Sequence, residues 1–241
     1  MDLIITSRMG SSRLPGKALK EVVGFGSMLE ILIKRAKLSN QIDRVIIATT
    51  KLESDDKLVE WAKEKNYNFY RGSENNVLQR LIDTCEYYNV KNFVEILGDN
   101  PLVDPDVIKK CISTFNSKNL NYVATMTKEY KFADLNFCFP IGIRVQIISL
   151  KILELIKNNI TTDYEREHAT SYLYDKPNLE GLELIKNDIY KDKLGFSNWN
   201  YAVNDMEGFN NMAFILSSLG IKFSWIEMIK LSNKVNMFKT P

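Results

Sequence analysis

The sequence predicts an α/β fold: a Rossmann-like, mostly parallel sheet with helices on both faces. Short β-branched and aliphatic runs alternate with segments of helical periodicity through the first half of the chain. This β-α-β-α order is typical of parallel sheets. The 241 residues correspond to about 1.6 average domains. Because no internal repeat, low-complexity tract or Gly/Ser-rich linker divides the chain, we expect a single domain over residues 1–241.

The first half is expected to supply four strands and four helices. Apolar runs predict strands at residues 3–6, 44–49, 68–70 and 92–97. Helical periodicity predicts helices at residues 28–38, 55–65, 76–88 and 105–115, the last with Pro105 in its first turn. Ligands of such sheets bind beyond the carboxyl ends of the strands. We therefore expect one crevice lined by residues 7–17, 49–50, 71–73 and 98–99.

The second half is less regular. We expect strands or extended segments at residues 122–125, 143–148, 181–185 and 200–203. Helices are expected at residues 150–157, 163–174, 207–219 and 224–232. Residues 115–200 are expected to form a small arm or lobe over the crevice, or a contact between two copies of the chain in a homodimer.

Composition excludes several functional classes. With 32 basic and 30 acidic residues, the net charge of +2 argues against a partner that is nucleic acid or a membrane surface. The single histidine, His168, excludes multi-histidine zinc sites. Cys85, Cys111 and Cys138 are widely spaced in apolar runs, which favours core thiols over disulfides or a catalytic cysteine. Neither a signal peptide nor a transmembrane segment is indicated, so we expect a soluble, cytoplasmic protein.

Residues 7–17, S-R-M-G-S-S-R-L-P-G-K, carry the strongest chemical signal. Three cations, three hydroxyls and two glycines directly follow a predicted strand. Glycines let backbone amides approach phosphate oxygens, and Arg8, Arg13 and Lys17 neutralise negative charge. Ala18 stands where a Walker loop requires Ser or Thr, and the G-x-G-x-x-G pattern is absent. The segment is therefore expected to be a phosphate-binding loop of another kind.

Five blocks, in order, resemble the cytidylyltransferases that make CMP-activated sugars, in the branch of spore-coat polysaccharide proteins of the SpsF type. They are R-M-G-S-S-R-L-P-G-K at 8–17, V-I-I-A-T-T at 45–50, Y-R-G-S-E-N-N-V-L-Q-R at 70–80, G-D-N-P-L at 98–102 and Y-E-R-E-H-A-T at 164–170. CMP-Kdo and CMP-sialate synthetases have a similar loop. With the matching 203–209 stretch, the resemblance spans about residues 3–210.

The resemblance implies a GT-A-like nucleotidyltransferase fold and transfer of CMP from CTP to a small acidic acceptor, with release of pyrophosphate. It implies catalytic roles for Arg13, Lys17 and Asp99. It places Mg²⁺ on Asp99, in keeping with the preference of this cation for carboxylates and phosphate oxygens. It also implies a nucleotide-binding set made up of Arg8, Met9, Gly10, Ser11, Arg13, Lys17, Thr49, Arg71, Ser73, Arg80 and Gly98.

A second metal carboxylate is expected in the V-N-D-M-E-G-F stretch at residues 203–209. Asn204 stands where the family has Asp, and Asp205 follows one position later. We expect Asp205 to be the ligand through a shifted turn. The alternative is a helix N-cap at Asn204 or Asp205, a position that both residue types favour. Both roles are compatible if Asn204 caps the helix while Asp205 binds the metal.

Four residues are expected on the acceptor side: Arg144, Glu165, Arg166 and His168. Arg144 stands where relatives commonly have an acid, which favours an additional anionic group on the acceptor. A solvent-exposed Arg144 is the alternative. Glu165 and His168 are three residues apart, so a helix would place them on one face, toward the acceptor or a partner subunit. A structural role for His168 also stays open.

Three other functions remain as alternatives. A sugar-1-phosphate nucleotidylyltransferase shares part of the loop spacing, but the Y-E-R-E-H block does not belong to it. A nucleotide-sugar glycosyltransferase would need a D-x-D triplet after the fourth strand, where this chain has Gly98-Asp99-Asn100, and Asp104-Pro105-Asp106 lies where a helix begins. A non-catalytic binding module is supported only by the substitution at Asn204.

Overall fold

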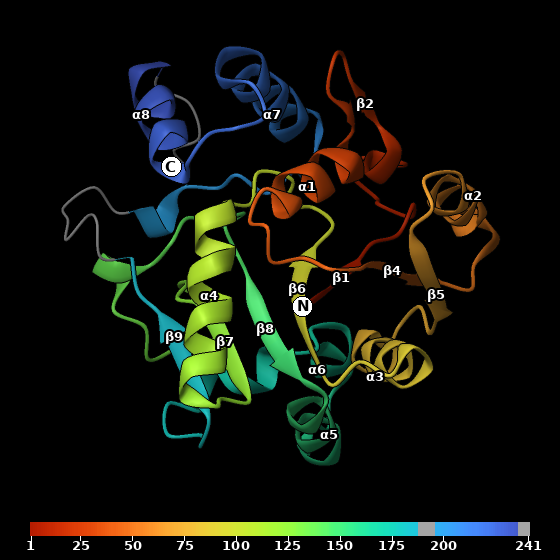
Figure 1. Cartoon of the computed structure of the whole chain (residues 1–241), viewed down its shortest axis with the longest axis vertical. Coiled ribbons are helices and arrows are strands. Elements are labelled where there is room, and N and C mark those ends of the chain that lie inside the picture. The colour runs from red at the N-terminus through yellow and green to blue at the C-terminus, as the bar shows by residue number, and fades with distance from the viewer. Residues whose placement is uncertain (188–195, 236–241) are drawn as a thin grey trace.

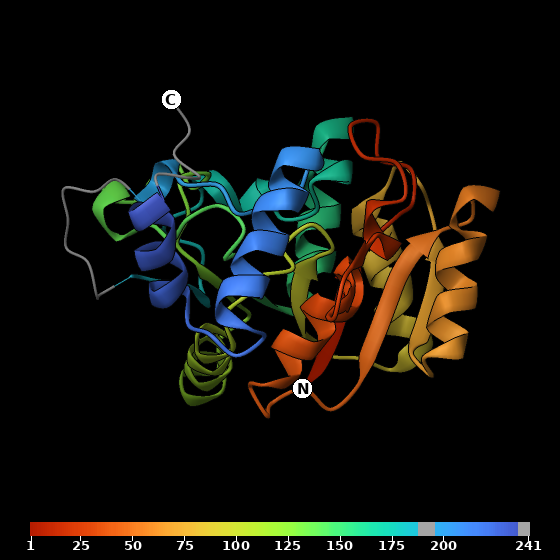
Figure 2. The ribbon, with the colours of Figure 1, turned by 90° about the horizontal axis from the view of Figure 1, so that it is seen from above.

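The computed structural model describes residues 1–187 and 196–235, and a seven-stranded sheet forms its centre. The sheet has the order β5-β4-β1-β6-β8-β7-β9. Figures 1 and 2 show the edge strands β5 and β9 at opposite ends of the molecule. The strands are β1 (Asp2–Thr6), β4 (Val45–Thr50), β5 (Asn68–Gly72), β6 (Asn92–Leu97), β7 (Tyr122–Thr125), β8 (Gln146–Ser149) and β9 (Leu182–Ile185).

Helices cover both faces of the sheet. The longer helices are α1 (Met28–Lys37), α2 (Asp56–Glu64), α3 (Val77–Tyr88), α4 (Pro105–Lys118), α5 (Leu150–Asn159), α7 (Met206–Leu219) and α8 (Trp225–Val235), and α6 (Asp163–Glu167) is short. Apolar residues of α1, α2, α4, α7 and α8 belong to one core cluster, and those of α3 and α5 belong to the other. Helices α3, α5 and α6 lie together in Figure 1.

The alternation of side chains along the strands accounts for the two cores. Leu3 and Ile5 of β1 pack into the cluster of α1 and α4, whereas Ile4 between them packs into the cluster of α3 and α5. A strand that is buried on both faces needs such a continuous apolar run. This layering confirms the predicted fold class.

The sheet is parallel in its first half, and one later strand is reversed. β5, β4, β1 and β6 pair in parallel, and so do β7 and β9. β8 is antiparallel to both of its neighbours, β6 and β7. Its amino end therefore lies at the edge where β1 and β6 have their carboxyl ends. This reversal brings residues that precede β8 toward the ligand-binding edge.

The second half corrects several expectations. The strand expected at 143–148 is β8 (Gln146–Ser149), and of the extended segment 200–203 only Asn200 forms an isolated bridge, to Ile141. The helix expected at 163–174 stops at Glu167, and a separate 3-10 helix follows at Ser171–Asp175. Part of the segment expected as an arm, residues 115–200, instead adds β7, β8 and β9 to the main sheet, while residues 188–195 lie outside the described residues.

A small hairpin was not predicted. β2 (Glu21–Val22) pairs with β3 (Gly26–Ser27) between the phosphate loop and α1. These strands have two residues each, too short for an alternating pattern to stand out. The hairpin leads into Ser27, whose hydroxyl accepts a hydrogen bond from the Glu30 amide and caps α1.

The three cysteines confirm the predicted core positions. Cys85, Cys111 and Cys138 are buried free thiols. Burial raises the pKa of each thiol, to about 12 for Cys85 and Cys111 and to about 11 for Cys138. Such thiols are poor nucleophiles because the thiolate is the reactive form. None of the helices in the described ranges is long and apolar enough to cross a membrane.

Candidate active site

A pocket of about 400 Å³ opens at the carboxyl ends of β1 and β6. It lies where parallel α/β sheets place their ligands. The lining comes from the loop after β1, the start of α3, the end of β6 and the segments that flank α6 and α7: Thr6, Ser7, Arg8, Gly10, Ser11, Ser12, Arg13, Lys17, Ala18, Met28, Glu74, Val77, Arg80, Leu97, Gly98, Asp99, Glu167, His168 and Asn204.

The predicted phosphate loop forms one side of this pocket. Arg8 and Arg13 are exposed, whereas the side chain of Lys17 is 14% exposed. Gly16 has φ of 72° and starts the turn that brings Lys17 back toward the pocket. Gly98 lies so close to β1 that a Cβ there would approach Ser7 Oγ to 2.8 Å. A glycine at position 98 is therefore required for the ends of β1 and β6 to meet.

Lys17 and Asp99 form the floor of the pocket together with Asn204. The Lys17 ammonium donates hydrogen bonds to the Val203 carbonyl at 2.8 Å and to Asn204 Oδ1 at 3.1 Å, and it lies 3.9 Å from Asp99 Oδ2. Burial lowers the pKa of Lys17, an effect that the Asp99 carboxylate opposes. Burial likewise raises the pKa of Asp99, although Lys17 and Arg13 act to lower it.

Asp99 keeps one oxygen without a partner. Its Oδ1 is buried and has no hydrogen-bond partner among the residues that the structure describes. A buried carboxylate oxygen that is left unpaired costs free energy unless a ligand satisfies it. Cations and phosphate-bound metal ions are the natural partners of such an atom. The floor of the pocket is therefore prepared for a positively charged group beyond Lys17.

Asp55 supports the loop from behind, a role that the sequence did not reveal. This buried carboxylate accepts hydrogen bonds from the Met9 amide at 2.7 Å, from the Thr49 hydroxyl at 2.8 Å and from Thr50. Burial alone would raise the pKa of Asp55, but these hydrogen bonds outweigh it and lower the pKa. Met9 and Thr49, both expected to bind nucleotide, are thus engaged with Asp55 and do not line the pocket.

The R-G-S block divides between support and pocket. Arg71 joins β5 to the loop after β4, with hydrogen bonds to the Thr50 and Leu52 carbonyls and an ion pair of 2.6 Å with Asp56. The Ser73 carbonyl accepts a hydrogen bond from Arg80 at 2.8 Å. Neither Arg71 nor Ser73 lines the pocket, whereas Arg80 does.

Arg80 is a buried cation at the edge of the pocket. It is 4% exposed, and its Nε has no partner within residues 1–187 and 196–235. Gly72 makes room for it, because a Cβ at that position would lie 2.6 Å from Arg80 Cγ. Gly72 and Arg80 therefore depend on each other sterically, a contact that the sequence alone cannot show.

Of the three residues expected from the Y-E-R-E-H block, only His168 lines the pocket, and Glu167, which was not expected, lines it as well. Glu165 closes a capping box with Thr162, and Arg166 forms an ion pair of 2.6 Å with Asp163, so both serve the start of α6. His168 is the C-cap of α6 and lines the pocket. Because the helix ends at Glu167, the expected shared face of Glu165 and His168 does not form.

Two carboxylates that the sequence did not single out face Arg8. Arg8 lies 3.9 Å from Glu74, which precedes α3, and 3.7 Å from Glu167 at the end of α6, and both acids line the pocket. Both distances exceed the range of direct hydrogen bonds. Arg8 is thus held loosely between two acids, and an incoming anion would compete with them for its guanidinium.

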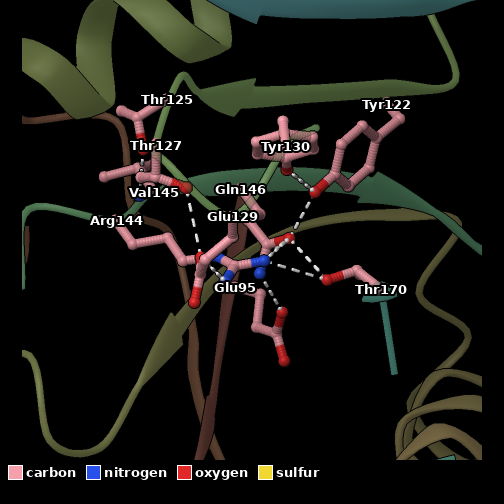
Figure 3. Close-up of polar contacts among 10 residues, drawn as sticks. All are labelled: Glu95, Tyr122, Thr125, Thr127, Glu129, Tyr130, Arg144, Val145, Gln146 and Thr170. Atoms are coloured by element: carbon pink, nitrogen blue, oxygen red, sulfur yellow. Dashed lines mark hydrogen bonds and ion pairs between the residues drawn. The ribbon is translucent and has the colours of Figure 1, made fainter. Parts of the chain in front are cut away.

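Arg144 lies below the pocket surface. It is 8% exposed, which excludes the solvent-exposed alternative, and Figure 3 shows its guanidinium directed at Glu129, Gln146 and Thr170. It does not line the pocket. Because Arg144 contacts other side chains and not the pocket, it can influence a ligand only through those side chains.

At the second proposed metal position, the two neighbours exchange roles. Asp205 is the N-cap of α7 and accepts a hydrogen bond from the Gly208 amide at 2.9 Å, whereas Asn204 lines the pocket. The expectation that Asn204 caps the helix while Asp205 lies in the pocket is therefore wrong. The Val203 amide donates to the Asp99 carbonyl at 2.8 Å, which fixes this segment beside the pocket floor.

The residues present fit a divalent cation that is shared with a ligand. Within the described ranges, no group of three or more His, Cys, Asp or Glu side chains is placed to hold a metal ion. The unpartnered Oδ1 of Asp99 is nevertheless a hard oxygen donor in a cation-accepting position. Mg²⁺ usually binds through one or two carboxylates plus phosphate oxygens and waters, and this donor set matches that pattern.

The comparison with known proteins identifies the family. The sequence model of the cytidylyltransferases matches residues 3–199. The chain belongs to the cytidylyltransferase family. Its membership agrees with the phosphate loop, the position of Asp99 and the five ordered sequence blocks, and cytidylyltransferases are nucleotidyltransferases.

Individual members of the family support this assignment. An uncharacterised protein of Methanocaldococcus jannaschii is 35% identical over 176 residues, 73% of this chain and 68% of the relative. The spore coat polysaccharide biosynthesis protein SpsF of Bacillus subtilis is 29% identical over 188 residues, 76% of this chain and 73% of the relative. A solved cytidylyltransferase of Leptospira borgpetersenii superposes with a TM-score of 0.85 at 25% identity, covering 100% of this chain and 97% of the other.

Proposed function

We propose that this cytidylyltransferase transfers the CMP unit of CTP to a small acidic acceptor, a sugar acid or a related phosphate or phosphonate, and releases pyrophosphate. The observation that carries the proposal is the pocket floor, where Lys17 and the loop cation Arg13 lie near a half-buried Asp99 with one buried, unpartnered oxygen. A triphosphate needs clustered cations and a site for its metal ion, and this floor offers both.

The reaction is an attack by an acceptor oxygen on the α-phosphorus, with pyrophosphate leaving. Such transfers depend on positioning and charge neutralisation more than on covalent help from the protein. In the proposed reaction, Arg13 and Lys17 bind the triphosphate and stabilise the charge that develops on pyrophosphate. Arg8 leaves Glu74 and Glu167 to contact the incoming phosphates. No protein nucleophile is required.

Asp99 is the residue that would hold Mg²⁺. When bound, the cation would supply additional neutralisation of phosphate charge. Asn204 contributes an uncharged oxygen nearby, but that oxygen accepts a hydrogen bond from Lys17. The protein therefore offers one carboxylate at this position, and the remaining ligands would come from phosphate oxygens and water.

The acceptor is proposed to enter on the side of Glu167 and His168. These two residues line the pocket from the segment at the end of α6. An acceptor oxygen that belongs to a carboxylate, phosphate or phosphonate is already ionised at neutral pH. Such an acceptor lowers the demand for a general base, and His168 then serves in binding.

The test is a pyrophosphate-release assay. The protein is incubated with Mg²⁺ and each of CTP, ATP, GTP and UTP against a panel of sugar acids and small phosphonates, while nucleotide binding is measured by calorimetry. We expect CTP to bind and to give pyrophosphate with at least one acid. The proposal fails if CTP neither binds nor reacts with any of them, or if another nucleotide is preferred.

A further inference from the structure

A buried polar cluster lies beneath the α6 side of the pocket. It combines Arg144 and Glu95 with Gln146, Thr170 and two tyrosines, and its members come from β6, β7, β8 and the segments around them (Figure 3). Glu95 is 3% exposed and Gln146 is 2% exposed. Polar groups gathered at such depth normally have a specific partner for each atom.

Gln146 is the centre of the cluster. Its Oε1 accepts hydrogen bonds from Arg144 Nη2 at 3.1 Å, from the Thr170 hydroxyl at 2.9 Å and from the Tyr122 hydroxyl. Its Nε2 donates to Glu95 Oε2 at 2.7 Å. Three donors and one acceptor fix the amide of Gln146 in a single orientation, so the cluster is a rigid arrangement of side chains.

Thr170 is the member that reaches the pocket segment. Its hydroxyl donates to Gln146 and accepts a hydrogen bond from Arg144 Nη2 at 3.1 Å. Thr170 follows His168 by two residues, and the His168 carbonyl accepts a hydrogen bond from the Ser171 amide at 2.7 Å. The turn that carries Glu167 and His168 is thus fastened to the sheet through the Thr170 side chain.

Stability alone does not account for this cluster. Removing charged groups from water costs free energy that their mutual attraction only partly returns, and apolar residues of similar volume often replace buried ion pairs without loss. The surroundings are already apolar, since Phe93, Ile148 and Leu173 belong to the same side of the sheet. What the cluster provides in addition is directional contact with one segment, the one that ends α6.

We propose that Thr170 and Arg144 are positioning residues that hold Glu167 and His168 at the edge of the pocket. The role of these positioned residues in binding the acceptor rests on the function proposed above. Arg144 therefore influences the acceptor without contacting it. Arg144 precedes β8. Its ion pair of 2.5 Å with Glu129 joins it to the segment after β7, and its hydrogen bond with Thr170 joins it to the segment after α6.

The test uses His168 as a reporter, because the chain contains only one histidine. One imidazole Hε1 signal is therefore expected in a ¹H–¹³C NMR spectrum, and it needs no assignment among several. Thr170→Val has nearly the same shape and removes only the hydroxyl. We expect the imidazole signal of the free Thr170→Val protein to shift or broaden beyond the wild-type line width, because the turn is no longer fastened.

Two matched variants serve as controls. Thr170→Ser keeps the hydroxyl and should restore the wild-type signal. Ser171→Ala removes the neighbouring hydroxyl, which is buried and has no partner in the part of the chain that the structure describes, and should leave the signal unchanged. If Thr170→Val unfolds, Thr170→Ala provides a second variant. An unchanged signal in a folded variant that lacks the hydroxyl would overturn the proposal.

A kinetic measurement separates positioning from general damage. For the acid that the wild-type protein uses in the pyrophosphate assay, Thr170→Val should raise KM at least about fivefold, equivalent to about 1 kcal/mol at 25 °C. The Kd of CTP should stay near the wild-type value, because the phosphate loop does not contact Thr170. Equal losses for both substrates would contradict positioning. If the wild-type protein binds no CTP, the proposed function fails, and the NMR comparison of the free proteins still decides the role of Thr170.

Discussion

The two sides of the pocket are built in opposite ways. The loop side consists of residues 7–17 together with Asp99, and its cations are partly exposed, such as Arg8 with 43% of its side chain accessible. The α6 side consists of Glu167 and His168 above the buried cluster of Arg144, Gln146 and Thr170. One side is a short continuous stretch of sequence, whereas the other is assembled from distant segments.

The difference shows how recognition of two substrates can be separated. A triphosphate carries the same charges in every nucleotide, so loosely held cations on a glycine-containing loop are sufficient to bind it. An acceptor must be selected by shape and by directional contacts, which a rigid buried framework supplies. Changes on the loop side should therefore alter turnover and nucleotide affinity, and changes beneath α6 should alter stability and acceptor use.

The largest effect is expected on the loop side, at Asp99. Asp99→Asn removes the charge of the only carboxylate on the pocket floor among the described residues, and turnover should fall by at least about a hundredfold. Pyrophosphate release measures the loss, and the melting temperature should stay close to that of the wild type. Asp205→Asn is the matched control, because Asp205 caps α7 outside the pocket and its replacement should keep most of the turnover.

A large effect on stability is expected beneath α6, at Glu95. Burial raises the pKa of this carboxyl from the ordinary 4.5 to about 7, although Arg144 and Arg80 act to lower it. Because the folded state binds the proton more tightly than the unfolded state, the protein loses stability as the pH rises from 4.5 to about 7. Glu95→Gln has no proton to lose, so its stability relative to wild type should increase over this range by up to about 3 kcal/mol.

Urea unfolding of Glu95→Gln and wild type at about pH 5 and about pH 8 measures this difference. The direction in which the stability difference changes with pH is decisive, because an acid with a lowered pKa would give the opposite trend. A stability difference that does not change with pH would mean that Glu95 titrates normally and that the cluster keeps it charged.

A smaller effect is expected at position 204 of the pocket floor, where this chain has the amide of Asn204 in place of a carboxylate. Asn204→Asp adds a negative charge beside Asp99, so Mn²⁺ should bind the nucleotide-free protein about tenfold more tightly. Calorimetry with MnCl₂ alone measures this affinity without any turnover. If the variant binds Mn²⁺ no better than the wild type, residue 204 does not face the same cation as Asp99.

The smallest effect distinguishes nucleotide binding from support at Arg71. Arg71→Met removes three contacts, to the end of β4, to the loop that follows it and to the start of α2, and should lower the free energy of unfolding by about 1–2 kcal/mol. The Kd of CTP should hardly change, since Arg71 does not line the pocket. Arg13→Met, on the loop side, should weaken CTP binding about tenfold instead. A comparable loss of affinity in both variants would restore Arg71 to the nucleotide site.

Sequence reasoning succeeded where the chemistry is contiguous. The layered fold, the boundaries of β6 and β7, and the placement of Arg13, Lys17 and Asp99 at one pocket all follow from local patterns. It failed where a contact depends on how one element packs against the next. Arg71 and Thr49 have residue types suited to a ligand, but their partners, Asp56 and Asp55, are visible only in three dimensions.

The reversed strand explains why the position of Arg144 was not predicted. In a parallel sheet, ligands lie at the carboxyl ends of the strands, so residues that precede a strand lie at the other edge. Because β8 is antiparallel to β6, Arg144 lies before its amino end at the same edge of the sheet. Nothing in the local pattern of residues 143–148 distinguishes the two directions, so the burial of Arg144 could not be foreseen.

The buried thiols can report local unfolding of the two core layers. Cys85 belongs to the core layer of α3 and α5, and Cys111 to the layer of α1 and α4. Both are shielded and protonated in the folded state, so an alkylating reagent should modify each one only when its own layer opens. Mass spectrometry of the two labelled peptides would then time the opening of each layer separately, in the unaltered chain.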